Sequence, residues 1–188
     1  SHWSKAANSD DWWAPELAPY LFDKRMRLNP NLMLLADIKT QPTASAPLQG
    51  FESISGANSA IIGHPKLELN TVPTPQAKLP KLMTTTGAVT MKNYSPTKAG
   101  KKGDFHHTYG ACVVEIVGKT FHLRQLNAVK DGSFMDLDRE YTAEQVRKVE
   151  QLAGLVMGDT HEEFVDPRVV EATFGPRGII SALKPAYL

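Results

Sequence analysis

The stretch Gly154-Leu155-Val156-Met157-Gly158-Asp159-Thr160-His161 places a short apolar run directly before an acidic residue and a histidine. The apolar run predicts a buried strand at residues 155–157, and the glycine after it allows the backbone to turn out of a sheet. In open α/β sheets, ligands bind at the carboxyl ends of the strands. A carboxylate and an imidazole at that position suit zinc, manganese or iron. We therefore expect Asp159 and His161 to be metal ligands; the alternative is a surface Asp and His on a turn.

Two capped helices are expected on either side of this stretch. Residues 142–145 (TAEQ) have the form of a capping box, and the apolar stripe after them predicts a helix over residues 142–153. Asp166 and Pro167 predict an N-cap and first position of a second helix. The next strand is expected at residues 186–188. Helix, strand, acidic turn, helix and strand form the opening of a βαβ layer.

The composition leaves no global preference for a charged partner. Lys and Arg number 21 and Asp and Glu 20, a net charge of +1, so any attraction to nucleic acid or membrane must be local. No apolar segment approaches the length of a membrane span, and the start does not read as a secretory signal. Cys112 is the only cysteine, which excludes an internal disulfide and fits a reducing, cytoplasmic compartment.

The region before residue 140 predicts an α+β domain with a mixed sheet. A helix is expected over residues 15–27 and a buried strand over residues 32–38. Residues 108–117 and 120–126 predict a hairpin whose two-residue turn begins with glycine, in a sheet buried on both faces. The whole chain is thus predicted to be α/β, with an amino-terminal domain at residues 1–140 and the start of another domain at residues 141–188.

One local stretch is strongly basic. Residues 92–102 contain four lysines and no acidic residue, and their glycines predict a flexible loop. Together with nearby histidines and an arginine, this loop is a candidate nucleic-acid contact; the alternative is a solvated loop. The candidate residues are Lys92, Lys98, Lys101, Lys102, His106, His107 and Arg124. Upstream, we expect His64 to lie in an exposed turn; the alternative is that it contacts a phosphate.

Residues 156–161 resemble the first motif of calcineurin-like metallophosphoesterases, in which an Asp-x-His at the end of the first strand supplies ligands to a two-metal centre. Upstream stretches resemble the amino-terminal region of tailed-phage metallophosphoesterases of the T5-like kind, which act in host-DNA degradation and DNA transfer. These stretches are residues 59–66, 84–90, 105–111 and 121–125.

The resemblance implies a function for a longer protein. Asp159 and His161 would bind two divalent ions (Mn, Mg, Fe or Zn) together with ligands that do not follow His161 in this chain: a bridging aspartate, an Asn-His pair and two further histidines. The reaction would be two-metal hydrolysis of DNA phosphodiesters in the host-cell cytoplasm. This chain, which starts at Ser1 rather than Met, would be the amino-terminal portion and inactive alone. Residues 1–140 would bind the substrate or a partner, and residues 141–188 would be the start of a truncated metallophosphoesterase domain.

Two non-enzymatic functions remain open. The chain could be a DNA-binding module that uses the basic loop. It could instead be a protein-interaction domain that docks on a host protein or self-assembles through Trp3, Trp12 and Trp13.

Overall fold

The computed structural model describes residues 15–75, 80–158 and 166–188. The chain forms two compact units, Ser1–Ala128 and Val129–Leu188, whereas the functional division predicted at residue 140 stays a prediction. The predicted α/β class is confirmed, with a sheet of mixed direction. In chain order the elements are η1 (Pro15–Tyr20), β1 (Arg25–Asn29), β2 (Leu32–Leu35), β3 (Ser59–Ile62), β4 (Leu69–Val72), β5 (Lys81–Thr85), α1 (Lys98–His106), β6 (Gly110–Val117), β7 (Thr120–Asn127), β8 (Phe134–Asp136), β9 (Arg139–Tyr141), β10 (Val146–Lys148), α2 (Pro167–Phe174) and α3 (Ile179–Leu183).

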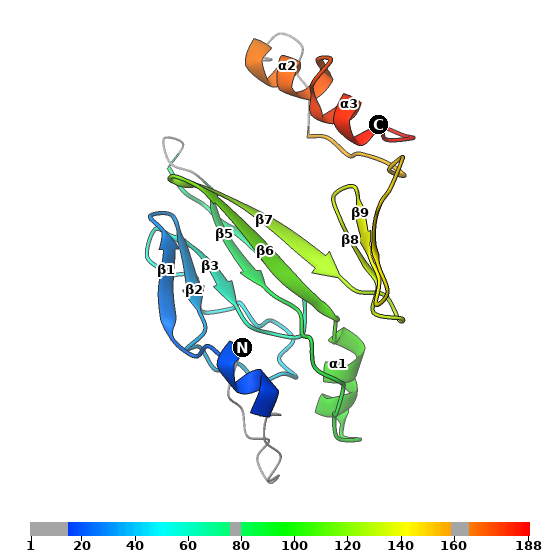
Figure 1. The fold of residues 1–188 in the computed structure, drawn as a ribbon. Coiled ribbons are helices and arrows are strands. Elements are labelled where there is room, and N and C mark those ends of the chain that lie inside the picture. Colours follow the sequence, from blue (N-terminus) through cyan, green and yellow to red (C-terminus); the bar gives the residue numbers. More distant parts are fainter. Residues whose placement is uncertain (1–14, 76–79, 159–165) are drawn as a thin grey trace. The chain divides into compact units, whose positions relative to one another are not determined.

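A five-stranded sheet in the order β1-β2-β3-β5-β4 forms the body of the first unit (Figure 1). Its central pairs, β2 with β3 and β3 with β5, are parallel, and both edge pairs are antiparallel. Central parallel strands are covered on both faces, which favours apolar side chains along them. Leu32, Leu35, Ile62 and Met83 are accordingly 0% exposed, which confirms the buried strand predicted from residue 32.

The predicted helix over residues 15–27 is wrong. Only a short 3₁₀ turn forms at Pro15–Tyr20, and Pro19 lies inside it. A proline there has no backbone N–H to donate, so a longer helix would lose a hydrogen bond. Residues 25–27 instead pair antiparallel with β2, between Arg25 and Leu35 at one end and Arg27 and Met33 at the other. Pairing with a buried strand outweighs the helical spacing of the leucines.

The predicted β6–β7 hairpin is confirmed, with eight residue pairs from Gly110 and Asn127 to Val117 and Thr120. Gly118 begins the turn at a φ of 59°, the left-handed region that a primed two-residue turn requires at its first position. The predicted burial on both faces is wrong, since Val117 is 69% exposed. In Figure 1 the hairpin crosses one face of the five-stranded sheet and lies at the surface of the unit.

The predicted helix over residues 142–153 is also wrong. Thr142 Oγ1 does accept a hydrogen bond from Gln145 N (3.1 Å), as in a capping box. However, Thr142 N donates to Gln145 O (3.0 Å), which closes a tight turn instead. This turn joins β9 to β10 in a three-stranded sheet of the second unit, with Val146 paired to Tyr141. The residues with the capping pattern therefore form the turn of a hairpin, because the strand after them pairs with β9.

The second predicted helix is confirmed as α2. Asp166 is its N-cap and accepts a hydrogen bond from Arg168 N (2.8 Å), and Gly175 ends it. The buried strand predicted at residues 155–157 is wrong, because Val156 is 97% exposed. An isolated parallel bridge joins Gly154 to Tyr187 instead. Within the described ranges, no helix is both long and apolar enough to span a membrane.

Candidate functional site

The basic segment predicted as a flexible loop is largely the helix α1. Thr97 is its N-cap, and Thr97 Oγ1 accepts a hydrogen bond from Gly100 N (3.1 Å). Gly100 and Gly103 are buried where the helix packs onto the chain before it. A Cβ at Gly103 would lie 2.7 Å from the ring of Tyr94, and one at Gly100 would lie 2.0 Å from Ser95 O. The glycines thus permit close packing of a helix.

The opposite side of α1 carries the predicted lysines. Lys98, Lys101 and Lys102 are all exposed. Phe105, which the sequence interpretation missed, is 83% exposed and completes an i, i+3, i+4, i+7 series with them. Residues at this spacing share one side of a helix. We call these four residues the α1 face. Their spacing is visible in the sequence once the segment is treated as helical.

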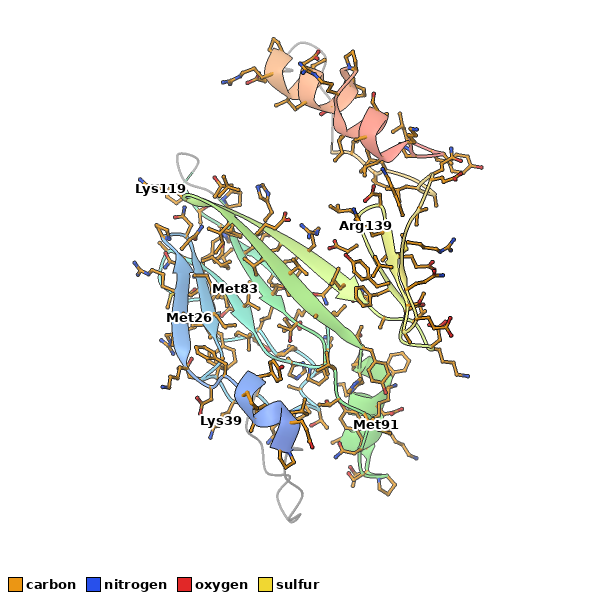
Figure 2. All side chains as sticks on the ribbon, viewed as in Figure 1. Met26, Lys39, Met83, Met91, Lys119 and Arg139 are labelled. Carbon is orange, nitrogen blue, oxygen red and sulfur yellow. The ribbon has the colours of Figure 1, made fainter. Side chains whose placement is uncertain are left out.

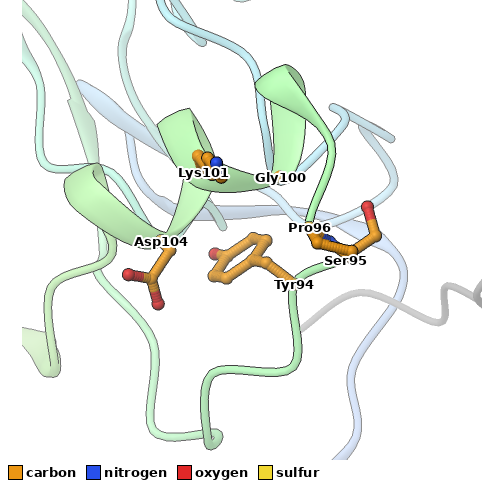
Figure 3. Close-up of a pocket in the computed structure, with 6 residues that line it drawn as sticks. All are labelled: Tyr94, Ser95, Pro96, Gly100, Lys101 and Asp104. Atoms are coloured by element: carbon orange, nitrogen blue, oxygen red, sulfur yellow. The ribbon is translucent and has the colours of Figure 1, made fainter.

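A shallow pocket lies beside the start of α1 (Figure 3). It has a volume of about 220 Å³. Its lining residues are Tyr94, Ser95, Pro96, Gly100, Lys101 and Asp104. Burial raises the pKa of Tyr94, so its hydroxyl keeps its proton. The lysine and the carboxylate make the pocket polar, and Lys101 connects it to the α1 face.

The two predicted histidines have different surroundings. His106 is the last residue of α1, and its ring meets the ring of Phe105 edge-on with centroids 5.1 Å apart. His107 instead packs between Tyr94 and Tyr109, and its Nδ1 lies 2.9 Å from the Tyr94 hydroxyl. Burial, followed by the nearby charge of Lys92, lowers the pKa of His107. His107 therefore belongs to the packing beneath α1, whereas His106 adjoins the α1 face.

The other two predicted contact residues are engaged in ion pairs. Lys92 Nζ donates to the backbone oxygen of Asp104 (2.8 Å) and lies 3.7 Å from its carboxylate. Arg124 on β7 pairs with Glu115 on the neighbouring strand at 2.6 Å. The structure thus brings Lys98, Lys101, Lys102 and His106 together on α1, with Lys92 beside them, while Arg124 belongs to the hairpin. Their contact with nucleic acid stays a prediction.

His64 and Lys81 are buried titratable residues whose side chains form hydrogen bonds with the backbone. His64 is 3% exposed, so the predicted exposed turn is wrong. Its Nε2 lies 3.0 Å from Gln41 O and its Nδ1 accepts from Lys66 N (3.0 Å), which leaves neither nitrogen for a phosphate. Burial lowers its pKa. Lys81 is 3% exposed and donates to the backbone oxygens of Glu52 and Gly56, and burial lowers its pKa as well.

Asp159 and His161, the predicted metal ligands, lie outside the described residues. Across residues 15–75, 80–158 and 166–188, no group of three or more His, Cys, Asp or Glu side chains is placed to hold a metal ion. Two ligands do not complete a two-metal site, which needs several oxygen and nitrogen donors for each ion.

Comparison with known proteins relates the chain to a bacteriophage protein. It is 33% identical over 178 residues to Protein A1 of Escherichia phage T5, a match that covers 89% of this chain and 32% of that protein. The chain thus spans about a third of the length of this curated relative. No family model matches the chain, so the metallophosphoesterase resemblance stays a hypothesis. No solved structure matches the chain either. The similarity to Protein A1 supports a bacteriophage origin for the chain.

Proposed function

We propose that the chain is the amino-terminal part of a bacteriophage metal-dependent phosphoesterase that hydrolyses phosphodiesters in DNA. Asp159 and His161 would be its first metal ligands. The other ligands would come from later in the protein, so this chain alone would be inactive. When bound, the metal ions would polarise the phosphoryl group for hydrolysis. The single observation that carries the proposal is the parallel pairing of the chain before Asp159 with the chain after α3.

This pairing consists of two backbone hydrogen bonds. Leu155 N donates to Tyr187 O (3.0 Å), and Ala186 N donates to Leu152 O (2.8 Å). Parallel neighbours need a crossover connection, and here it contains α2 and α3. In the sequence, Asp159 and His161 come shortly after the first of these two parallel segments. Ligand-binding residues of α/β sheets occupy that position.

The exposure of apolar side chains in the second unit also supports the proposal. Val156 is 97% exposed, Val169 58%, Phe174 49% and Ile179 45%. In an α/β layer, helices and parallel strands bury such side chains against further strands. Additional strands of the same protein would cover these residues. A protein of the length of Protein A1 has room for them, since this chain spans 32% of it.

The test is manganese-dependent hydrolysis of DNA by the complete protein and by its Asp159→Asn variant. We expect Asp159→Asn to lower the rate at least about 100-fold, because it removes an anionic metal ligand. Asp166→Asn is the matched control, since asparagine also caps helices and the α2 N-cap would remain. Undiminished hydrolysis by Asp159→Asn would overturn the proposal.

A DNA-binding module without catalysis is the second candidate. The observation that favours it is the α1 face, which joins three exposed lysines to an exposed aromatic ring. This candidate predicts DNA binding that survives chelation and an Asp159→Asn variant that behaves like the wild type.

A further inference from the structure

We propose that the α1 face binds single-stranded nucleic acid, with Lys98, Lys101 and Lys102 on backbone phosphates and Phe105 stacked on a base. The proposal deepens the proposed function by naming the form of the substrate, and it relies on that function only for the choice of DNA as the strand. It concerns binding in the absence of metal. It can therefore be tested separately from hydrolysis.

The charge of the α1 face has one sign. The nearest acidic side chain on the helix is Asp104, and Lys92 lies 3.7 Å from its carboxylate. This partner offsets the one negative charge of α1, so the three lysines keep a net positive field. Clustered positive charge on one face is the electrostatic signature of a nucleic-acid contact, even where the net charge of the whole chain is close to zero.

The exposed ring distinguishes this face from an ordinary solvated one. Phe105 is 83% exposed on the same side as the lysines, and Met91, on the segment that Lys92 ties to α1, is 85% exposed. Non-specific single-strand sites combine a positive surface with aromatic side chains on which bases stack. Bases in a duplex are already stacked on each other and offer no free face. The ring therefore favours a single strand over a duplex.

The length of the face sets the expected strength of binding. From Lys98 to Phe105 an α-helix rises about 10 Å, so the contact spans few nucleotides. Three phosphate contacts to a single strand predict a salt slope, in log K against log salt, of about −2. Binding should therefore be weak at physiological salt and clear at low salt.

The experiment measures fluorescence anisotropy of labelled oligo-dT with the 188-residue chain in EDTA, from about 50 to about 200 mM salt. We expect Lys101→Gln/Lys102→Gln to weaken oligo-dT binding at least about 10-fold at low salt. The same variant should bring the salt slope closer to zero by about 1.4. The matched control is Lys39→Gln/Lys119→Gln, which removes two exposed lysines of the same unit outside α1. Figure 2 shows Lys119 at the tip of the β6–β7 hairpin, far from α1.

Phe105→Ala tests the stacking separately from the charge. It should weaken oligo-dT binding about 10-fold, leave the salt slope unchanged and leave the weaker binding of a duplex unaffected, while Phe105→Tyr should restore binding. Circular dichroism of each variant checks that the fold is retained.

Three results would overturn the inference. The first is no binding of oligo-dT at low salt. The second is an equal loss of oligo-dT affinity in the α1 double variant and in its control. The third is binding of phosphatidylglycerol vesicles through α1 without binding of oligo-dT. Retained oligo-dT binding by a protein that does not hydrolyse DNA would contradict only the proposed function.

Discussion

The two compact units differ in the apolar surface that they bury. In Ser1–Ala128, the side chains of Leu32, Leu35, Ile62 and Met83 are completely buried between strands and loops. Among the described residues of Val129–Leu188, the buried ones are the two glycines at the ends of the loop between α2 and α3, at positions 175 and 178. Both units contain helices and strands, but only the first surrounds a hydrophobic core within the described part of the chain.

This difference shows which forces hold each unit. Burial of apolar side chains is the dominant stabilising contribution to folding, and the first unit obtains it from its own sheet. The second unit relies on local hydrogen bonds, such as the turn at Thr142 and the N-cap at Asp166. Its apolar side chains Val156, Val169 and Phe174 stay exposed. The difference can be tested by substitution in each unit.

The largest expected effect is in the core of the first unit. Leu35→Ala should lower the free energy of unfolding by about 2–5 kcal/mol, because it removes buried methyl groups and leaves a cavity. The matched substitution in the second unit is Val156→Ala, at a side chain that is 97% exposed, and it should change the value by less than about 0.5 kcal/mol. Urea unfolding followed by circular dichroism measures both. Similar losses for the two variants would contradict the contrast between the units.

A smaller effect is expected from acidification of the first unit. Burial holds the pKa of His64 below its ordinary value of 6.5. As the pH falls through 6.5, the unfolded chain binds a proton before the folded one, so stability is complete above that pH and declines below it. His64→Asn should reduce this decline in urea unfolding at a series of pH values. His107, whose pKa is also lowered, contributes in the same direction and remains in the variant. An unchanged pH profile would mean that His64 does not titrate as its burial requires.

The smallest effect is expected from the cap of α2. Asp166→Ala removes the acceptor for Arg168 N, so the first turn of the helix should open more often. Amide hydrogen exchange near Val170 should become faster, while exchange in β3 of the first unit should be unchanged. Asp166→Asn should keep the wild-type rate. Faster exchange in both units would show that their stabilities are coupled.

The sequence predicted those elements whose local pattern and tertiary environment agree. The apolar run that begins at Leu32 had to be buried, and the glycine at position 118 allowed the primed turn of the β6–β7 hairpin. Asp166 and Pro167 predicted the start of α2 because aspartate is a good N-cap and proline suits the first position of a helix. In each case a few adjacent residues are enough to determine the local structure.

The errors occurred where pairing or packing with a neighbouring segment, rather than the local pattern, decided the outcome. Residues 25–27 have helical spacing but pair with β2, and residues 146–148 follow a capping pattern but pair with β9. Gly100 and Gly103 predicted a loop, whereas they allow α1 to pack closely on Tyr94 and Ser95. Phe105 was missed as a neighbour of the predicted lysines because the segment was predicted to be a loop. Local propensities are weak compared with the stabilisation from strand pairing and packing.

The sequence by itself determined the α/β class, the buried strand that begins at Leu32 and the hairpin turn, and it alone supplies the prediction that Asp159 and His161 are metal ligands. The tertiary structure alone decided that three lysines and Phe105 share one helical side and that His64 is buried. The physical reason is the range of the interactions. Turns, caps and apolar runs depend on adjacent residues, whereas burial and strand pairing depend on segments that only folding brings together.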